Sequence, residues 1–376
     1  MAKVDYKICN RCVMDTTAEE IEFDSGGLCN FCRGFESNIK KRWFPNDEGK
    51  DKLKEIVSEI KKVGKGKKYD SIIGLSGGVD SSYLALIAKK ELGLNPLAVH
   101  VDAGWNSEIA VQNIENIVRK LDIDLFTYVV DWQEVRDLQR AYLRSGLANQ
   151  DVPQDHAFFA MLYRYAVENK IKYVLTGSNI ATESILPKSW GYYAMDVIQL
   201  KEIHKKYGEQ PLRSYPTLNL FQYYIYYPLV KKMKVVAPLN YLPYNREDAM
   251  KVLQEDLGYK SYGQKHHESV FTKFFQSYYL PIRFGFDKRK AHLSSLILSG
   301  QITREEALKE LKKEPYNKEN ILEDQIYVLK KLGISAEEFE QILNSPIKTY
   351  QDYKSFESTV FYKLVKPIYH QLKKKN

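Results

Sequence analysis

The segment Ser76-Gly77-Gly78-Val79-Asp80-Ser81-Ser82 carries the clearest chemistry in this chain of 376 residues. The apolar, β-branched run 70–75 before it predicts a buried strand, and the run 83–90 after it predicts a helix. A strand, a glycine-rich turn and a helix gather backbone N–H groups and hydroxyls at the positive end of a helix dipole. The glycines let an anion approach the backbone closely. We therefore expect a polyphosphate site, the alternative being an ordinary turn between strand and helix.

No lysine follows the glycines, so the segment is not a Walker-type loop. Its sequence after a strand resembles the signature of the PP-loop ATP pyrophosphatases. The resemblance implies that ATP, with Mg²⁺, is cleaved between its α and β phosphates, and that a nitrogen or sulfur nucleophile then displaces AMP. It implies ATP contacts from Ser76, Gly77, Gly78, Val79, Asp80, Ser81 and Ser82. Asp80 is also expected to be catalytic.

All four cysteines lie near the N-terminus, as the pairs Cys9 with Cys12 and Cys29 with Cys32. Two C-x-x-C pairs with this separation fit a zinc ribbon, whose knuckles point four thiolates at one tetrahedral Zn²⁺. Two disulfides are the alternative, which a cytoplasmic chain disfavours. Because zinc would use every thiol, no cysteine is left to hydrolyse glutamine or to carry a persulfide. Any ammonia must then come from solution or from a partner chain.

The elements that position these residues alternate between strand and helix from Tyr69 onward. We expect strands at 70–75, 96–101, 124–130, 172–176 and 234–237, and helices at 47–63, 80–92, 107–121, 153–169 and 245–257. This rhythm predicts an α/β fold with a doubly wound parallel sheet, whose ligands bind at the carboxyl ends of the strands. The segment 181–227 breaks the rhythm, and we expect it to be an insertion that covers the site.

The predicted organisation has four parts along the chain. They are a zinc ribbon (1–40), a helical linker (41–66), a PP-loop ATP-binding α/β domain (67–260) and a C-terminal helical region (261–376). Capping patterns at Thr303 and at Ser335 predict the starts of two helices in the last part.

Composition limits the class of protein and its partners. The net charge of +8 favours anionic ligands, although much of the excess lies in 61–68 and in the lysine tail, where solvation is expected. A nucleic acid is therefore allowed but not required, because ATP and a nucleotide-linked substrate satisfy the same bias. No apolar run is long enough to span a membrane and the N-terminus does not resemble a signal peptide, so we expect a cytoplasmic protein. The aromatic patch 221–228 suits a core or a subunit contact, with sugar or base stacking as the alternative.

Polar residues also follow two other predicted strands. In related pyrophosphatases the position of 100–106 lies beside the adenine, so Val101 and Asp102 are expected to contact ATP; a simple loop is the alternative. Thr176, Gly177 and Asn179 end the fourth strand and are similar to an element that approaches ATP phosphates or magnesium elsewhere in the superfamily. Glu183 is a weaker candidate.

Two later clusters combine cations with imidazoles or carboxylates. In the first, Lys265 and His266 are expected to be catalytic, by stabilising charge on the departing pyrophosphate, and a solvated polar face is the alternative. In the second, Arg289 is expected to hold a substrate phosphate with its planar fork. The further candidates for contact with substrate or pyrophosphate are His267, Glu268, Arg283 and Lys288, beside Asp287 and Lys290 in the second cluster.

Several of these features together resemble the N-acetyl sugar amidotransferase family of bacterial surface-polysaccharide and nonulosonate pathways. The resemblance rests on ribbon segments 9–15, 23–24 and 29–32, the PP-loop, and segments 265–272 and 286–295, and it extends to about Leu308. It implies that ATP activates the carbonyl oxygen of an acetamido group on a nucleotide-linked sugar. Pyrophosphate leaves an O-adenylyl imidate, and ammonia then expels AMP to give an acetamidino group.

The resemblance also implies a source of ammonia. Some relatives obtain it from a separate glutaminase acting with a cyclase-like protein, and the missing glutaminase cysteine agrees with that arrangement. One alternative is a tRNA-modifying PP-loop thiolase or ligase, although the lack of a spare cysteine disfavours sulfur transfer. Another is a ribbon-containing nucleotide sensor, which would bind ATP without releasing AMP.

Overall fold

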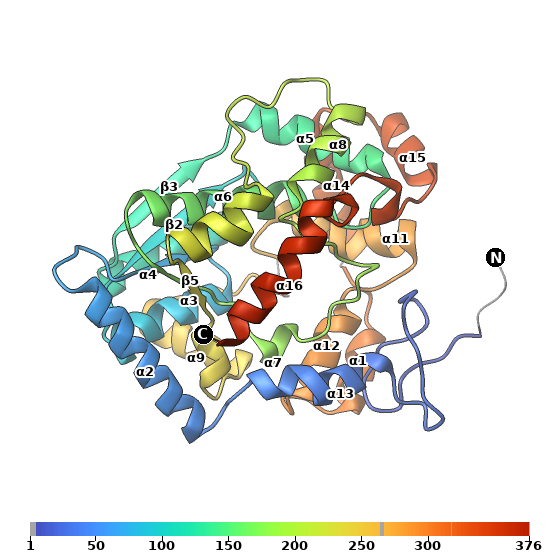
Figure 1. The fold of residues 1–376 in the computed structure, drawn as a ribbon. Coiled ribbons are helices and arrows are strands. Elements are labelled where there is room, and N and C mark those ends of the chain that lie inside the picture. Colours follow the sequence, from blue (N-terminus) through green and yellow to red (C-terminus); the bar gives the residue numbers. More distant parts are fainter. Residues whose placement is uncertain (1–4, 264–266, 317, 376) are drawn as a thin grey trace.

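The computed structural model describes residues 5–263, 267–316 and 318–375. Its centre is a five-stranded sheet in the order β3-β2-β1-β4-β5, with every pair of neighbours parallel (Figure 1). The strands are β1 (Ser71–Gly74), β2 (Pro96–Asp102), β3 (Leu125–Val129), β4 (Tyr173–Leu175) and β5 (Lys234–Val236). Successive strands are added first on one side of β1 and then on the other. The predicted doubly wound sheet is therefore confirmed, and its switch point lies between β1 and β4.

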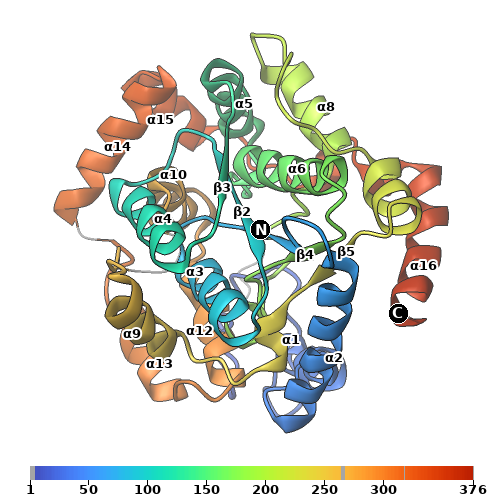
Figure 2. The ribbon, with the colours of Figure 1, turned by 90° about the vertical axis from the view of Figure 1, so that its left-hand side faces the viewer.

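A layer of helices covers each face of the sheet (Figure 2). Successive side chains of a strand point to opposite faces, and here both faces carry apolar side chains that the helices bury. Ile73 and Ala98 face a core shared with α2 (Asp47–Gly64), α3 (Val79–Leu86), α4 (Glu108–Leu121) and α9 (Arg246–Leu257). Ile72 and Val99 face a core shared with α5 (Trp132–Ser145), α6 (Val152–Glu168) and α8 (Val197–Tyr207). The five predicted helices correspond to α2, α3 with its continuation, α4, α6 and α9, whereas α5 and α8 are additional.

Most of the segment 181–227 packs beside the sheet instead of covering the strand ends. After α7 (Ile180–Glu183), α8 buries Leu200 and Ile203 in the same core as α5 and α6. In the aromatic patch, Tyr227 lies in this core, and Tyr224 is buried in a smaller one next to it. The prediction that the insertion covers the site is wrong for most of its length, because its apolar side chains are used for packing on α5 and α6.

The C-terminal region is helical, as predicted. Its helices are α10 (Val270–Phe274), α11 (Leu280–Phe284), α12 (Arg289–Leu298), α13 (Arg304–Leu311), α14 (Lys318–Leu332), α15 (Ala336–Asn344) and α16 (Val360–Lys375). The predicted caps are present: Thr303 forms a capping box with Glu306, and the Ser335 side chain accepts from the Glu338 N–H at 3.1 Å. None of the described helices combines the length and apolar character of a membrane span.

The cysteine-bearing segment, with α1 (Asn30–Gly34), packs against α12 and α13, through contacts between residues 275 to 295 positions apart in sequence (Figure 1). The Val13 N–H donates to Ser294 Oγ at 3.2 Å, and Lys290 forms an ion pair with the buried Asp15. All four cysteines belong to the same apolar core as α10, α11 and α15. We propose that the ribbon (1–40) and the C-terminal region (261–376), although predicted as separate parts, fold as one unit around this shared core.

Candidate active site at the carboxyl edge of the sheet

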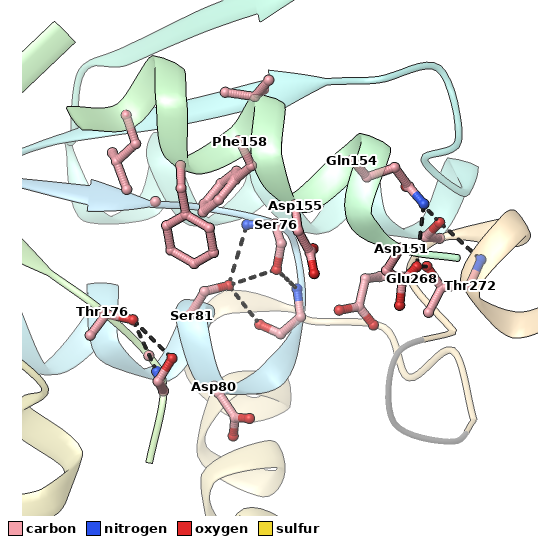
Figure 3. Close-up of a pocket in the computed structure, with 18 of the residues that line it drawn as sticks. Ser76, Asp80, Ser81, Asp151, Gln154, Asp155, Phe158, Thr176, Glu268 and Thr272 are labelled. Carbon is pink, nitrogen blue, oxygen red and sulfur yellow. Dashed lines mark hydrogen bonds between the residues drawn. The ribbon is translucent and has the colours of Figure 1, made fainter. Parts of the chain in front are cut away.

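The segment 76–82 forms the predicted turn between β1 and α3. Gly77 has a left-handed backbone (φ +81°), and a Cβ there would lie 2.6 Å from the Ala110 carbonyl oxygen of α4. The Ser76 and Ser81 hydroxyl oxygens are 3.2 Å apart, and the Gly78 N–H donates to Ser76 Oγ at 3.2 Å (Figure 3). Because α3 begins at Val79 without a side-chain cap, the positive end of its dipole lies at this turn. The local geometry is suited to an anion.

The loop that follows β4 packs directly on the start of α3. A Cβ at Gly177 would lie 2.9 Å from both the Asp80 carbonyl carbon and the Ser81 nitrogen, so only glycine fits without a shift. In the same loop Thr176 Oγ1 donates to Ser178 Oγ at 3.1 Å. The switch point between β1 and β4 therefore places two polar loops side by side.

A cavity of about 420 Å³ opens between these loops and α6 (Figure 3). One wall is apolar and contains Phe158, Phe159 and Leu162 of α6. This helix lies so close to β1 that a Cβ at Gly74 would be 2.3 Å from Phe158 Cζ. The opposite wall contains the turn and Thr176. An apolar wall beside hydroxyls and a helix N-terminus suits a flat base joined to phosphates.

Acidic side chains from separate elements also line this cavity, and they are Asp80, Asp151, Asp155, Glu183 and Glu268. Burial and the neighbouring Asp151 carboxylate raise the pKa of Asp155 to about 8, although solvent in the cavity reaches this side chain. Burial also raises the pKa of Asp151, which accepts from Thr272 Oγ1 at 2.8 Å and from Gln276 Nε2 at 3.3 Å. The charge of Lys288 opposes both shifts. The cavity thus holds a carboxyl group whose pKa lies above its ordinary range.

Two residues that follow the sheet in sequence, Glu268 and Tyr244, lie next to the turn 76–82 and the start of α3. The Ser107 N–H donates to the Glu268 carbonyl at 2.8 Å, and the Val270 N–H donates to the Trp105 carbonyl at 2.9 Å. This bridge holds Glu268 beside the turn, since a Cβ at Gly78 would lie 3.0 Å from Glu268 Oε1. On the other side of α3, the Tyr244 hydroxyl donates to Asp80.

The structure brings most of the predicted ATP-binding residues to the cavity. Those that line it are Ser76, Gly78, Val79, Asp80, Ser81, Val101, Thr176 and Gly177. Gly77 belongs to the turn, and its carbonyl accepts from the Tyr259 hydroxyl at 2.9 Å. Contact of these residues with ATP stays a prediction.

Besides Gly77, three predicted ATP-binding residues do not line the cavity. Ser82 is fully buried under the turn. The Asp102 carboxylate accepts from the Gly104 N–H at 2.7 Å and from Asn106 Nδ2 at 3.0 Å. The Asn179 side chain caps α7 by accepting from the Thr182 N–H at 2.9 Å. Asp102 and Asn179 thus have partners in the local fold, and contact of all three residues with ATP stays a prediction.

The first predicted cluster is only partly described. Lys265 and His266, the predicted catalytic pair, lie outside the described residues. Burial, with smaller contributions from the charges of Lys273 and Arg246, lowers the pKa of His267 to about 4, so this imidazole is neutral at physiological pH. His267 does not line the cavity.

The members of the second cluster lie in four different places. Lys288 reaches the cavity, whereas Arg289 forms an ion pair with Asp287 at 2.6 Å and lines a neighbouring cavity instead. Lys290 is paired with Asp15 of the ribbon. Arg283 is buried, and its guanidinium donates to the Ile342 carbonyl and to Ser345 Oγ. The Arg283 guanidinium thus fixes the end of α15, and its contact with substrate or pyrophosphate stays a prediction.

Sequence reasoning missed several residues that line the cavity, namely Asp151, Gln154, Asp155, Phe158, Arg246, Thr272 and Gln276. A signal for two of them was available. Asp151 and Asp155 are four residues apart at the start of a predicted helix, which places both on one face, and a helix that precedes a parallel strand begins at the ligand-binding edge. Thr272 and Gln276 reach the cavity only through tertiary packing of the C-terminal region.

The four cysteines form one buried cluster, as the ribbon interpretation requires. Their sulfur atoms all lie within 4.8 Å of one another. Cys9 Sγ is 3.8 Å from Cys32 Sγ, and Cys12 Sγ is 3.7 Å from Cys29 Sγ. A tetrahedral ion with bonds of about 2.3 Å separates its sulfurs by about 3.8 Å, so this geometry fits Zn²⁺. Backbone N–H groups of Arg11 and Met14, each 3.4 Å from a sulfur, would support the thiolates.

The cavity also offers ligands of the kind that ATP with Mg²⁺ requires. Mg²⁺ prefers oxygen ligands and is usually held by one or two carboxylates together with substrate phosphates and water. Asp80 and Glu268 supply carboxylates on two sides of the turn. Among the described residues no set of three carboxylates lies close enough to form a complete cage. The residues fit a cation that arrives with a polyphosphate.

Comparisons with known proteins match two separate ranges of the chain, and residues of both ranges line the cavity. A family described as NAD synthase matches residues 51–216, and a family described as LPS biosynthesis protein WbpG-like, C-terminal domain, matches residues 268–368. The first range carries the turn, α6 and the loop after β4. The second begins at Glu268 and carries Thr272, Gln276 and Lys288.

Curated relatives include glutamine-hydrolyzing GMP synthases. The protein of Thermosipho africanus is 31% identical over 153 residues, which are 38% of this chain and 27% of that protein. The protein of Elusimicrobium minutum is 25% identical over 282 residues, which are 75% of this chain and 48% of that protein. The chain thus spans less than half of the length of these relatives.

Solved structures with some similarity include an NH3-dependent NAD synthetase from Campylobacter jejuni, with 18% identity and a TM-score of 0.29 over 42% of this chain and 72% of that one. Another is the U34-tRNA thiolase NcsA from Methanococcus maripaludis with its 4Fe-4S cluster, with 16% identity and a TM-score of 0.34 over 69% of this chain and 80% of that one. The fold assignment rests instead on the strand order and the turn after β1.

The strand order and the turn after β1 give this chain a fold of the PP-loop type, and residues 51–216 match the NAD synthase family. Within that class, the C-terminal match adds a domain of the kind found in a lipopolysaccharide biosynthesis protein.

Proposed function

We propose that the protein is an ATP-dependent, AMP-forming amidotransferase that converts an acetamido group of a sugar into an acetamidino group. The product would serve bacterial surface-polysaccharide synthesis. The observation that carries this proposal is the composition of one cavity: its phosphate-binding side lies in the NAD synthase match, and Glu268, Thr272, Gln276 and Lys288 come from the WbpG-like match. A nucleotide site and a carbohydrate-pathway domain would thus build one active site.

In the first step the turn and the dipole of α3 hold the triphosphate, and the apolar wall of α6 holds the base. The acetamido oxygen attacks the α-phosphorus, the bond to the β-phosphate oxygen breaks, and pyrophosphate leaves. The amide nitrogen loses its proton, so an O-adenylyl imidate remains. Mg²⁺, bound with ATP near Asp80, would offset the charge of the phosphates. Lys288, which lines the cavity, would stabilise the negative charge that develops on the departing pyrophosphate.

In the second step ammonia attacks the imidate carbon. The nitrogen must then lose a proton, and Asp155 is suited to accept it because its pKa of about 8 lies near the working pH. The carbon–oxygen bond breaks, AMP leaves with the former amide oxygen, and the acetamidino group remains. The activation by ATP is needed because an amide oxygen is a poor leaving group.

The arrangement of thiols disfavours the alternative of sulfur transfer by a tRNA thiolase. All four cysteines of the chain lie in the buried cluster against α12 and α13, and none of them lines the cavity. A mechanism with a persulfide on the enzyme's own cysteine needs a thiol within reach of the adenylylated substrate. An ammonia-dependent reaction needs none, and a separate glutaminase with a cyclase-like protein is the partner that we propose as its source.

The test is an incubation with ATP, ammonium and a panel of acetamido sugars, free and nucleotide-linked. We expect AMP and pyrophosphate in equal amounts with the correct sugar only, and a product in which one oxygen is replaced by NH, detected by mass spectrometry. Formation of ADP and phosphate, or of AMP without a sugar product, would contradict the proposal. Bound tRNA in the purified protein would favour the alternative.

A further inference from the structure

The C-terminal helix α16 lies on the outside of the molecule, beside the helical segment Gln222–Val230 (Figure 1 and Figure 2). The two pack together through Tyr224 and Tyr362, whose ring centres are 5.8 Å apart, and Val365 packs against the same small core. None of the described residues of these two elements lines the candidate active site or the cavity next to it. The proposed function therefore gives this surface no role.

The apolar side of α16 is wider than its packing on the protein requires. At about 100° per residue, Val360, Phe361, Leu364 and Val365 fall within an arc of about 140°. Val365, with Tyr362 next to this arc, packs on the rest of the protein. By contrast, Val360 is 74%, Phe361 40% and Leu364 64% exposed. Most of the arc thus faces solvent.

The segment beside α16 also exposes large apolar side chains, at both of its ends. Phe221 is 51%, Leu229 41% and Val230 58% exposed. Apolar groups that gather on neighbouring exposed elements mark an interaction surface. We call the six side chains the C-terminal apolar surface, and they are Phe221, Leu229, Val230, Val360, Phe361 and Leu364.

Lysines border this surface, and they are Lys231, Lys232, Lys363 and Lys366. Lys231 lies over the Tyr226 ring at 5.2 Å and Lys366 over the Tyr362 ring at 5.0 Å, which keeps both ammonium groups at the surface. In the described part of the chain, no carboxylate oxygen lies within 4.0 Å of any of these four ammonium groups. Three more lysines end the sequence.

Carboxylates are scarce along the same two stretches. The sequence has no Asp or Glu in 210–246 and none in 358–376. Of the carboxylates that border the two elements, Glu59 forms an ion pair with Lys234 at 3.0 Å, and the charge of Glu168 acts on Tyr227 together with that of Arg164. Glu357 is exposed just before α16. The surface therefore keeps an excess of positive charge.

We propose that the C-terminal apolar surface docks the protein on an anionic lipid bilayer. The exposed side chains of α16 would enter the boundary between headgroups and acyl chains, and the lysines would contact the headgroup phosphates. Apolar groups flanked by lysines on an exposed helix are typical of helices that lie in a membrane interface. The inference does not depend on the proposed function.

Two other occupants fit the surface less well. Contact between two copies through this face would bring lysines against lysines, without a carboxylate to separate them. A nucleic acid would satisfy the lysines, but it would leave the aliphatic Val360 and Leu364 in water. A bilayer satisfies both the apolar side chains and the charges.

The test is sedimentation of the full-length protein with vesicles. The vesicles consist of phosphatidylcholine alone or of phosphatidylcholine and phosphatidylglycerol at about two to one. We expect binding to the anionic vesicles to be about tenfold tighter or more, and high salt to remove the difference because it screens the lysines. Binding to neither kind of vesicle, or equal binding to both at low salt, overturns the inference.

Leu364→Glu tests the apolar contribution, because a carboxylate would have to enter the bilayer boundary. We expect its dissociation constant for anionic vesicles to rise about tenfold or more. Leu322→Glu is the matched control on α14, since Leu322 is 60% exposed, changes the net charge equally and is followed by Glu323 and Asp324. The control should stay close to wild type. Equal weakening by both variants would show an effect of net charge alone and overturn the proposed surface.

Lys363→Gln with Lys366→Gln tests the charges. We expect this pair to remove most of the preference for anionic vesicles. Lys61→Gln with Lys62→Gln is the control, because it removes two exposed charges from α2. Equal effects of the two pairs overturn the inference.

Two further outcomes would assign the surface to another occupant and so overturn the inference. One is a wild-type dimer, seen by sedimentation without vesicles, that Leu364→Glu dissociates while no vesicle is bound. The other is nucleic acid that the purified protein retains and that the variant at Lys363 and Lys366 loses, again without binding of vesicles.

Discussion

Asp80 is the only acidic residue within the turn 76–82, and it lines the cavity at the start of α3. We expect Asp80→Ala to reduce AMP formation at least a hundredfold, because the carboxylate that faces the phosphates and their cation is lost. The zinc content should stay unchanged, since Asp80 has no part in the cysteine cluster. Assays of AMP and zinc in the same preparation test both statements, and a variant with full activity would contradict the role of Asp80.

Asp155 gives a test based on pH, without any substrate. Its pKa of about 8 in the folded protein lies above the ordinary value of about 4, so the folded state binds more protons than the unfolded state between these values. The free energy of unfolding therefore loses this contribution as pH rises from about 4 to about 8. Asp155→Asn removes the effect, so the stability of the variant relative to wild type should increase across that window and level off above it.

Urea unfolding of both proteins at about pH 5, 7 and 9 measures this difference. The exposed Asp256→Asn serves as the matched control and should show a difference that does not vary with pH. If the free energy of unfolding of Asp155→Asn relative to wild type were also independent of pH, the pKa of Asp155 would not be raised in the folded protein.

At the scale of single residues, the sequence predicted a site where its residues are close together in the chain. The turn 76–82 and the four cysteines could be recognised because their spacing alone sets their geometry. Arg283 could not be placed, because its partners lie near residue 342, and a cation in a polar run looks the same whether it binds a ligand or caps a helix. The capping role of Asn179 was missed for a related reason, since a helix cap also needs a polar residue at a strand end.

At the scale of elements, the approach of the β4 loop to α3 depends on Gly177. A Cβ there would lie 2.9 Å from backbone atoms of Asp80 and Ser81, which cannot move without shifting the turn. We expect Gly177→Ala to cost about 1–3 kcal/mol of stability, as overpacking does, and to raise the KM for ATP at least tenfold. Gly34→Ala is the control, because no atom lies within 4 Å of its added Cβ. Normal stability and KM in Gly177→Ala would contradict this account.

The central strands β1, β2 and β4 were predictable because a buried parallel strand is a short apolar run between turn residues. The edge strands β3 and β5 are partly exposed, and they were predicted from their β-branched and aromatic residues within the alternation of strands and helices. α8 was missed because the segment around it reads as irregular, and its helical character is supported by packing of Leu200 and Ile203 rather than by pattern alone. The pairing of 106 with 269, which brings Glu268 to the turn, joins segments too distant for any local pattern to reveal.

Arg304 connects the cysteine-bearing ribbon to α13, which lines the cavity next to the candidate nucleotide site. At the start of α13, its Nε donates to the Cys12 carbonyl at 3.1 Å and its Nη2 to the Cys9 carbonyl at 3.0 Å. We expect Arg304→Gln to raise the KM for the acceptor, the acetamido sugar of the proposed reaction, several-fold with little change in the KM for ATP, because only the wall formed by α12 and α13 loses support. Equal changes in both constants would indicate a general loss of structure instead.

At the scale of the whole molecule, the cysteine cluster and the C-terminal helices share one core, while the nucleotide side of the cavity rests on the sheet. Removal of zinc with a chelator should therefore abolish acceptor binding before ATP binding and lower the unfolding temperature, because thiolates without metal cannot stay together in a buried cluster. Elemental analysis should give one zinc per chain. A protein that loses its metal without any change in acceptor affinity would contradict this coupling.

The central claim is that the acetamido oxygen attacks the α-phosphorus of ATP. An acceptor labelled with ¹⁸O in its acetamido group tests it directly, with AMP analysed by mass spectrometry after reaction with ATP and ammonium. The account predicts one ¹⁸O atom in the phosphate of each AMP formed and none in the amidine product. Unlabelled AMP, with the isotope retained in the sugar product, would contradict the account.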